Sequence, residues 1–254
     1  MRVAALYDIH GNLPALDAVL AEIATLGCDR IVIGGDVALG PMPRETLARL
    51  DGLGERVGWI RGNCDREMGA ALERPPDPAK PWEARLRWAA GCLTPAQCQR
   101  LAGLPLRITL DIGGLGPVLF CHATPRSDEE VVTRLSPEAR LAETLAGIPE
   151  RVVISGHTHV QFDREVQGRR WINAGSVGMP YQGRTGAYWV MLGPGVDLRR
   201  TAYDADAAAR RIEASGFPDA ERFARQELLA PITAAAASER FEQMSVQARA
   251  KSSA

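Results

Sequence analysis

The segment VAALYDIHGNLPALDAVLAEIATL, residues 3–26, decides the fold class of this chain. Its apolar run at Val3–Leu6 is typical of a short buried strand, and Leu13–Leu26 repeats its apolar residues at helical spacing. The same order continues with a strand at Arg30–Ile33, a helix at Arg44–Leu50 and a strand at Val57–Ile60. Strands that alternate with helices predict a layered α/β fold with parallel strands.

The middle of the chain predicts a hairpin among helices. Leu106–Ile112 and Val118–Cys121 have the composition of strands, and the glycine-rich turn 113–116 separates them. Arg66–Pro81 is rich in proline and charge, which predicts a loop that rims a site. Helical segments are predicted at Trp82–Gly91, Pro95–Gly103 and Asp128–Ala146.

The last part of the chain predicts antiparallel strands followed by helices. A tight Gly193-Pro194-Gly195 reversal favours antiparallel pairing of the later strands. Those strands are predicted at Val152–Ser155, Arg169–Asn173, Ala187–Leu192 and Val196–Tyr203, and the helices at Asp206–Ser215 and Asp219–Leu229. The alanine-rich tail from Thr233 is compatible with a docked helix, a contact with another subunit or a frayed end. We therefore expect one α/β domain at residues 1–203, and a C-terminal helical extension at residues 204–254 that packs on it.

Charge and composition narrow the functional classes. The 254 residues contain 30 Lys and Arg against 31 Asp and Glu, so no field of one sign attracts nucleic acid or an anionic membrane. The sequence has no apolar run near the roughly 18 residues of a membrane span, and Met1–Leu6 leaves no room for a secretory leader. The five cysteines are scattered without zinc-type spacing, which favours a reducing cytoplasm.

The four histidines of the chain give the main clue to function. His10, His122, His157 and His159 each fall at or just after the end of a predicted strand. Loops at the carboxyl ends of parallel strands are where open α/β sheets gather their ligands. A metal is the simplest reason to bring these side chains to one point.

Carboxylate and amide oxygens follow the same strands. Asp8 and His10 are two residues apart and point the same way from an extended segment, while Asp36 and Asn63 each follow glycine, which lets the backbone turn sharply near the site. This mixed donor set suits Mn, Fe, Zn or Co without choosing among them. Seven ligands are too many for one catalytic ion, so we predict two divalent ions that share Asp36 as a bridge: Asp8, His10, Asp36, Asn63, His122, His157 and His159.

At this point the chain resembles the calcineurin-like metallophosphoesterases, from Met1 to about Tyr203. The ordered blocks that carry the resemblance are Asp8-Ile9-His10, Gly35-Asp36, Gly62-Asn63-Cys64-Asp65, His122 and Gly156-His157-Thr158-His159. The resemblance implies a four-layer α-β-β-α sandwich. It also implies one ion held by Asp8, His10, Asp36 and His159, and a second held by Asp36, Asn63, His122 and His157.

The mechanism that the resemblance implies is attack on phosphorus by a metal-bridging hydroxide, with Asp36, Asn63 and His122 as catalytic residues. Cys64 stands where many members of the family have histidine, as in a small prokaryotic branch with phosphodiesterase-like members. A thiol could donate a proton, and a site near metals could depress its pKa, but it is a poorer cation than imidazolium. We therefore expect a preference for phosphodiesters with good leaving groups.

Several residues near these blocks could have either a functional or a structural role. Asn12, Cys64 and Arg126 are predicted substrate contacts, although a helix cap, a packed thiol and a solvated arginine are the respective alternatives. Asp65 could orient a ligand or pair with Arg66. Residues 173–178 are expected to support the metal ligands, and Tyr181 to line the mouth of the site or pack in the core.

Two other functions stay open at the level of sequence. One is a phosphomonoesterase or nucleotide pyrophosphohydrolase, and the other is a metal-binding scaffold without turnover, since one fold hosts many functions. The expected partner is a small phosphoester or nucleotide, with no membrane and no extended nucleic-acid surface, and a homo-oligomer is compatible with the sequence.

Overall fold

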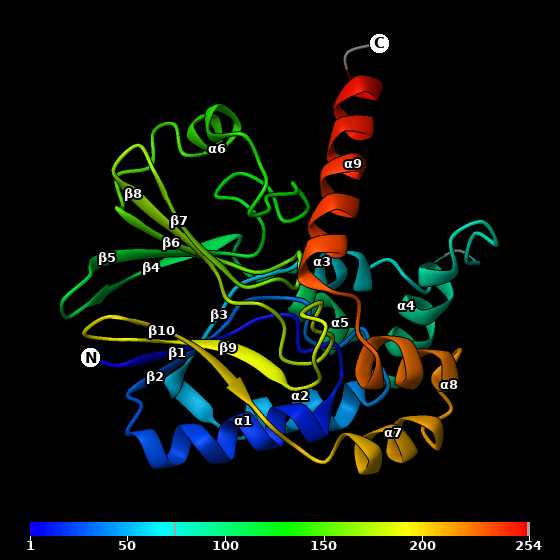
Figure 1. The fold of residues 1–254 in the computed structure, drawn as a ribbon. Coiled ribbons are helices and arrows are strands. Elements are labelled where there is room, and N and C mark those ends of the chain that lie inside the picture. The colour runs from blue at the N-terminus through cyan, green and yellow to red at the C-terminus, as the bar shows by residue number, and fades with distance from the viewer. Residues whose placement is uncertain (74, 253–254) are drawn as a thin grey trace.

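Two five-stranded sheets stack face to face in the middle of the molecule (Figure 1). The computed structural model describes residues 1–73 and 75–252; residue 74 of the predicted loop and residues 253–254 of the predicted extension lie outside this part. The first sheet has the order β10-β9-β1-β2-β3 and the second β4-β5-β6-β8-β7. The strands are β1 Val3–Leu6, β2 Arg30–Ile33, β3 Val57–Trp59, β4 Arg107–Ile112, β5 Gly116–Cys121, β6 Val152–Ser155, β7 Phe162–Val166, β8 Arg169–Asn173, β9 Ala187–Leu192 and β10 Val196–Thr201.

In each sheet three neighbouring strands pair in parallel, and the other two strands join by antiparallel pairing. β1, β2 and β3 are parallel to one another, and so are β5, β6 and β8. β9 and β10 complete the first sheet by antiparallel pairing, as β4 and β7 do in the second. The antiparallel expectation for the later strands is therefore correct for β9 and β10 and wrong for β6 and β8.

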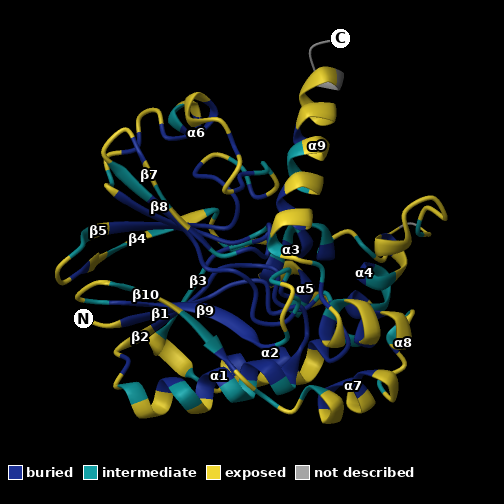
Figure 2. Cartoon of the chain, viewed as in Figure 1, coloured by how far each residue is buried: buried dark blue, intermediate teal, exposed yellow. Residues whose placement is uncertain are grey.

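Alternating side chains along β1 explain the layers. Val3 and Ala5 point between the sheets, where they pack in one buried cluster with Phe120 of β5. Ala4 and Leu6 point the other way, into the cluster that includes the helices of the first sheet. This period of two is what a strand buried on both faces requires. Figure 2 shows the resulting buried strands inside an exposed outer shell.

Helices cover the outer face of each sheet and produce the predicted four layers. α1 and α2 cover the first sheet, and α6 packs its Leu141 against Val153 and Trp171 of the second. The helices are α1 Leu13–Leu26, α2 Pro43–Asp51, α3 Asn63–Met68, α4 Pro81–Cys92, α5 Pro95–Ala102, α6 Glu138–Thr144, α7 Ala205–Glu213, α8 Ala220–Phe223 and α9 Ala234–Ser252, with a 3-10 turn at Gly54–Arg56 and a π-helical turn at Ala224–Leu229. The α-β-β-α sandwich is thus confirmed.

Two further expectations about local structure were wrong. The stretch Asp128–Ala146 is helical only at α6, because hydroxyls before it accept hydrogen bonds from nearby backbone N–H groups: Ser127 from Glu129 and Glu130, and Ser136 from Thr133. Such local bonds compete with a helix. The predicted loop from Arg66 begins inside α3, since the Asp65 carboxylate accepts from the N–H of Gly62 and closes the first turn of that helix. β7 has no counterpart in the predictions.

The C-terminal segment forms helices that return to the rest of the chain. Ile212, Phe217 and Phe223 belong to the same buried cluster as α1, and α9 is anchored to α6 by the ion pair of Arg140 and Glu242 at 2.6 Å. Of the three alternatives for the tail, the structure shows a docked helix at α9. The division into residues 1–203 and 204–254 stays a prediction. Within the described part of the chain, no helix combines the length and the apolar character needed to cross a membrane.

Candidate metal centre

The predicted ligands meet where the parallel strands of both sheets end. Asp8 and His10 follow β1, Asp36 follows β2, and Asn63 follows β3; His122 follows β5, and His157 and His159 follow β6. The first sheet therefore supplies four of the seven residues and the second supplies three. Because the two sheets stack with these edges together, residues from distant parts of the chain converge at one point.

The backbone is unusual at these positions. Seven non-glycine residues of the described chain have φ in the left-handed region, and five of them are predicted ligands: Asp8, His10, Asp36, His157 and His159. Such a conformation costs on the order of 1 kcal/mol for a non-glycine residue and persists where the surroundings enforce it. The concentration of this strain at the predicted ligands indicates a functional site.

Close backbone approach explains the glycines that precede Asp36 and Asn63. A Cβ on Gly62 would lie 2.1 Å from Oδ1 of Asp36, and a Cβ on Gly35 would lie 2.4 Å from the backbone nitrogen of Gly62. Any side chain at either position would force the two loops apart. The structure thus confirms the reading of these glycines as close-approach residues.

The donor atoms form two overlapping groups. Asp8, His10 and His159 offer ligand atoms within 4.8 Å of one another, and so do Asp8, Asp36 and His122. Oδ2 of Asp36 lies 3.9 Å from Nε2 of His10 and 3.6 Å from Nε2 of His122, so this carboxylate faces a histidine of each predicted set. Oδ1 of Asp8 has a similar position, 3.3 Å from Nε2 of His159.

Orphaned polar atoms test whether this pocket suits metal ions. Oδ1 of Asp8, Oδ1 of Asn63 and Nε2 of His122 are buried and have no hydrogen-bond partner in the described part of the chain. A buried polar atom without a partner costs roughly 1–3 kcal/mol. All three are the atoms through which these residues would bind an ion, so the site fits divalent cations.

Backbone carbonyls orient three of the histidines. Nδ1 of His10 lies 3.0 Å from the carbonyl oxygen of Leu39, and Nδ1 of His159 lies 2.7 Å from that of Met179. Nδ1 of His122 lies 2.7 Å from the carbonyl oxygen of Gly34. A carbonyl accepts only from a protonated nitrogen, so Nδ1 donates in each ring and Nε2 is left to bind a metal.

Charge at the centre favours a cation. Burial lowers the pKa of His122, but the carboxylates of Asp36 and Asp8 outweigh burial and raise it to about 10. For His157, burial and then the charge of His122 lower the pKa to about 4. The carboxylates therefore attract one proton to His122, and a divalent ion would replace that proton as it binds.

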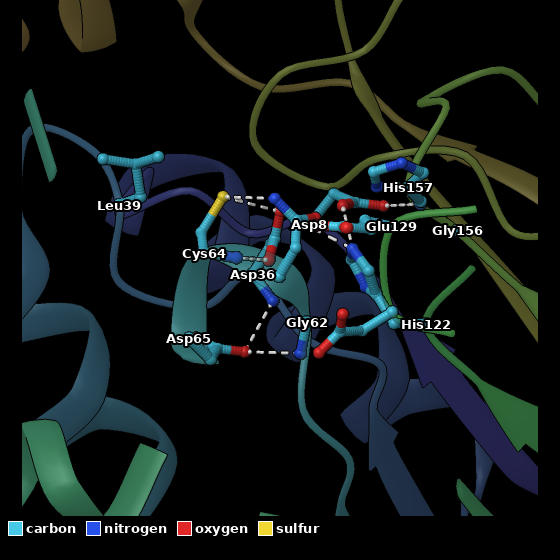
Figure 3. A network of polar contacts seen from close by, with 12 residues as sticks. Asp8, Asp36, Leu39, Gly62, Cys64, Asp65, His122, Glu129, Gly156 and His157 are labelled. Atoms are coloured by element: carbon cyan, nitrogen blue, oxygen red, sulfur yellow. Dashed lines mark hydrogen bonds and ion pairs between the residues drawn. The ribbon is translucent and has the colours of Figure 1, made fainter. Parts of the chain in front are cut away.

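Asp65 and Cys64 both form hydrogen bonds with Asp36, as Figure 3 shows. The Asp65 carboxylate accepts hydrogen bonds from the N–H groups of Asp36 at 2.7 Å, Gly62 at 3.0 Å and Val37 at 3.1 Å. The Cys64 thiol donates to Oδ2 of Asp36 at 2.9 Å. Burial and the charge of Asp36 raise the pKa of this thiol, which keeps it protonated.

The other predicted contacts are engaged within the chain. Oδ1 of Asn12 accepts from the N–H of Ala15, and its Nδ2 donates to the carbonyl of Gly178 at 2.9 Å, so Asn12 is a helix cap. Arg126 donates to Glu130 at 2.7 Å and to Glu143 at 3.1 Å. To contact a phosphate, it would have to leave both carboxylates.

Residues 173–178 support the ligand loops. Asn173 donates to the carbonyl of Gly156 at 2.5 Å and to the hydroxyl of Thr158 at 3.1 Å, and Ser176 donates to the carbonyl of Asp8 at 2.7 Å. These bonds hold the segments on both sides of the centre. The contacts are those expected of supporting residues.

A cavity of about 560 Å³ opens beside His10, and most of its lining was missed at the level of sequence. Tyr181 lies at its inner end, where its ring stacks on His159 at 4.7 Å between centroids. Arg85, Arg222 and Arg240 also line it. No sequence signal distinguishes these arginines from others in the chain, because only the fold brings α4 with Arg85 and the C-terminal helices with Arg222 and Arg240 together beside His10.

The fold and the two groups of donor atoms are those of a metal-dependent hydrolase, and comparison with known proteins agrees with this class. The sequence model of the calcineurin-like phosphoesterase superfamily domain matches residues 1–192, and the chain belongs to this superfamily. It is therefore a phosphoesterase that depends on divalent metal ions. The resemblance seen in the sequence is confirmed at this level, while the branch suggested by Cys64 stays a prediction.

Individual relatives cover the chain to different extents. The chain is 27% identical over 237 residues to an uncharacterized protein of Methanocaldococcus jannaschii, a match that covers 85% of this chain and 94% of that protein. It is 40% identical over 85 residues to phosphodiesterase YfcE of Escherichia coli, covering 30% of this chain and 46% of that protein. The crystal structure of a metallophosphoesterase from Sphaerobacter thermophilus is similar with a TM-score of 0.69 and 26% identity, covering 91% of this chain and 98% of the other.

Proposed function

We propose that this chain hydrolyses phosphodiesters with two divalent metal ions. One ion would be held by Asp8, His10, Asp36 and His159 and the other by Asp36, Asn63, His122 and His157. The observation that carries the proposal is the set of buried ligand atoms without partners on Asp8, Asn63 and His122, which only a cation would satisfy together. The name of the Escherichia coli relative, a phosphodiesterase, favours diesters over monoesters.

Each group around the centre has a role in this proposal. When bound by these residues, two divalent ions would make water more acidic and would stabilise negative charge on a phosphoryl group. Asp36 is oriented by Asp65 and Cys64, and three histidines are oriented by backbone carbonyls. Because the Cys64 thiol donates to Asp36, the proposal gives it no part in protonating a leaving group.

The test compares bis(4-nitrophenyl) phosphate with 4-nitrophenyl phosphate. Protein stripped of metal is reconstituted with Mn, Fe, Zn or Co, beside Asp36→Asn and the exposed control Asp17→Asn. We expect diester turnover that needs metal, survives in the control and falls about 1000-fold or more in Asp36→Asn. Stoichiometric metal binding without turnover would identify a scaffold instead, and faster turnover of the monoester would identify a phosphomonoesterase.

The native metal pair, a cytoplasmic location and a homo-oligomer are further proposals from the sequence. Metal analysis of protein purified without chelator tests the first, and light scattering in solution tests the third.

A further inference from the structure

The cavity beside His10 joins the metal centre to the C-terminal helices. Its inner wall includes His10 and Tyr181, and its outer wall includes Phe217, Arg222 and Arg240. Its volume of about 560 Å³ is in the range of small-molecule sites. The superfamily match ends at residue 192, so the outer wall comes from a part of the chain that the shared domain does not contain.

Aromatic rings lead from the metal ligands into this cavity. The ring of Phe241 lies 6.4 Å from that of His157 and 6.3 Å from that of Tyr181. Further out, Trp82 is 42% exposed although it lines the cavity. A large aromatic side chain left open to a cavity offers a face on which a planar ring can stack.

The charge of the lining is positive. Arg85, Arg222 and Arg240 face a single acidic residue of the lining, Glu227. The Nε atom of Arg85 is buried and has no hydrogen-bond partner in the described residues, and its Nη2 approaches Asp219 only to 3.6 Å. Arg222 uses Nε for a hydrogen bond to Gln226 at 3.1 Å. The terminal nitrogens of Arg222 and the whole guanidinium of Arg240 form no hydrogen bond or ion pair within residues 1–73 and 75–250.

Arginine nitrogens without hydrogen-bond partners beside a phosphoesterase centre have a chemical purpose if the substrate has a second anionic group. Arginine forms paired hydrogen bonds with phosphate. The aromatic faces and the arginines share the same cavity. One ligand chemistry satisfies both: a planar ring attached to a further phosphate.

We infer that this cavity binds the part of the substrate that does not react, and that this part is a nucleotide with a further phosphate group. The inference rests on the proposed phosphodiesterase function, since it places the reacting phosphodiester at the metal ligands. The C-terminal helices then determine specificity, while the sheets provide the chemistry.

The test uses two substrates with the same leaving group. Methyl 4-nitrophenyl phosphate contains only the reacting diester, whereas the 5′-(4-nitrophenyl) ester of thymidine 3′,5′-bisphosphate adds a base and a second phosphate. The variant is Arg222→Gln combined with Arg240→Gln. The matched control is Arg225→Gln, an exposed arginine that lies in the π-helical turn following α8 and does not line the cavity.

We expect the wild type to prefer the nucleotide ester. The double variant should lower kcat/KM for that ester about tenfold or more and leave the small diester within about twofold, and the control should change neither. Equal losses on both substrates, or no preference in the wild type, would overturn the inference. If neither substrate is hydrolysed with any metal, the proposed function fails instead.

A binding measurement separates the two failures. Equilibrium dialysis of thymidine 3′,5′-bisphosphate against the full chain with metal removed does not depend on turnover. Binding by wild type and Arg225→Gln that weakens about tenfold in the double variant supports the cavity as a nucleotide site. Equal binding by all three proteins, or binding by none, contradicts it.

Discussion

At the scale of a residue, Asp65 positions the predicted metal ligand Asp36 although Asp65 is not itself a predicted ligand. Its carboxylate accepts from the N–H groups of Asp36, Val37 and Gly62, so it fixes both loops that carry Asp36 and Asn63. Asp65→Asn replaces one acceptor oxygen by a donor that faces N–H groups. We expect metal affinity to fall about 10- to 100-fold, as for other groups that support ligands.

Calorimetric titration of metal-free protein with Mn²⁺ measures this change. Asp111→Asn is the control, since Asp111 is an exposed residue of β4, which is an edge strand of the second sheet. Unchanged affinity in Asp65→Asn would show that the loops keep their positions without this carboxylate.

The second prediction at the scale of a residue concerns Cys64 and the leaving group. With its thiol directed to Asp36, no acid for a leaving group is provided at this position. Turnover should therefore depend steeply on the pKa of the leaving phenol among aryl methyl phosphodiesters, and alkyl diesters should be slow. Cys64→Ser, which keeps a donor toward Asp36, should leave that slope unchanged. Equal turnover of aryl and alkyl diesters would contradict this account.

Single residues also show where sequence reasoning succeeds. The donors of His10, His122 and His159 were predictable, because imidazole is rare in this chain and each ring follows a strand. Their supporting carbonyls at Leu39, Gly34 and Met179 were not, since every residue has a carbonyl. For the same reason the cap formed by Asn12 could not be told from a substrate contact before the fold was known.

At the scale of elements, Glu242 of α9 forms an ion pair with the buried Arg140 of α6. Glu242 accepts from Thr133 at 2.7 Å, from Ser136 at 2.5 Å and from Arg140 at 2.6 Å. Arg140 is 8% exposed, so Glu242→Gln leaves a buried guanidinium without its countercharge. We expect this change to lower the free energy of unfolding by about 2 kcal/mol at pH 7.

The pH dependence of this anchor follows from the pKa of Glu242. Burial raises that pKa, but the hydrogen bonds from Ser136, Thr133 and Arg140 outweigh burial and lower it below the usual 4.5. Its stabilising effect is thus complete above the unfolded value and is lost as pH falls through the lower folded value. Urea unfolding at pH 7 and near pH 3 should show a penalty for Glu242→Gln that disappears in acid. The exposed Glu239→Gln should show none at either pH.

Elements differ in how far the sequence predicts them. Runs such as Arg30–Ile33 were predicted to the residue, because apolar β-branched side chains between turn residues have one common solution. The helix predicted for the stretch before α6 was wrong because Ser127 and Ser136 accept hydrogen bonds from backbone N–H groups there. The spacing of apolar residues does not reveal such bonds. β7 has apolar residues only at its two ends, Phe162 and Val166, and the three residues between them are charged, so its sequence is not typical of a strand.

At the scale of the whole molecule, the metal centre connects the two sheets. Ligands after β1, β2 and β3 face ligands after β5 and β6, so bound ions would link the two layers through their buried donor atoms. A ligand that binds only the folded state stabilises it by mass action, by about 4 kcal/mol at 1,000 times its Kd. Chelation should therefore lower Tm by several degrees.

Differential scanning calorimetry with and without chelator tests this prediction. Added Mn²⁺ should restore the Tm of the wild type and leave that of Asp36→Asn nearly unchanged. A Tm that does not respond to metal in the wild type would mean that the ions do not bind the fold tightly.

The position of β1 in the first sheet has a consequence for synthesis on the ribosome. β1 leaves the exit tunnel before the other strands of its sheet, yet it lies between β2 and β9, with Ala5 paired to both Val32 and Val190. The edge of β1 that pairs with β9 therefore stays unpaired while most of the chain is translated. Contacts of such long range form late, and an unpaired apolar strand is prone to aggregate in the meantime. The nascent chain should consequently depend on chaperones until β9 emerges.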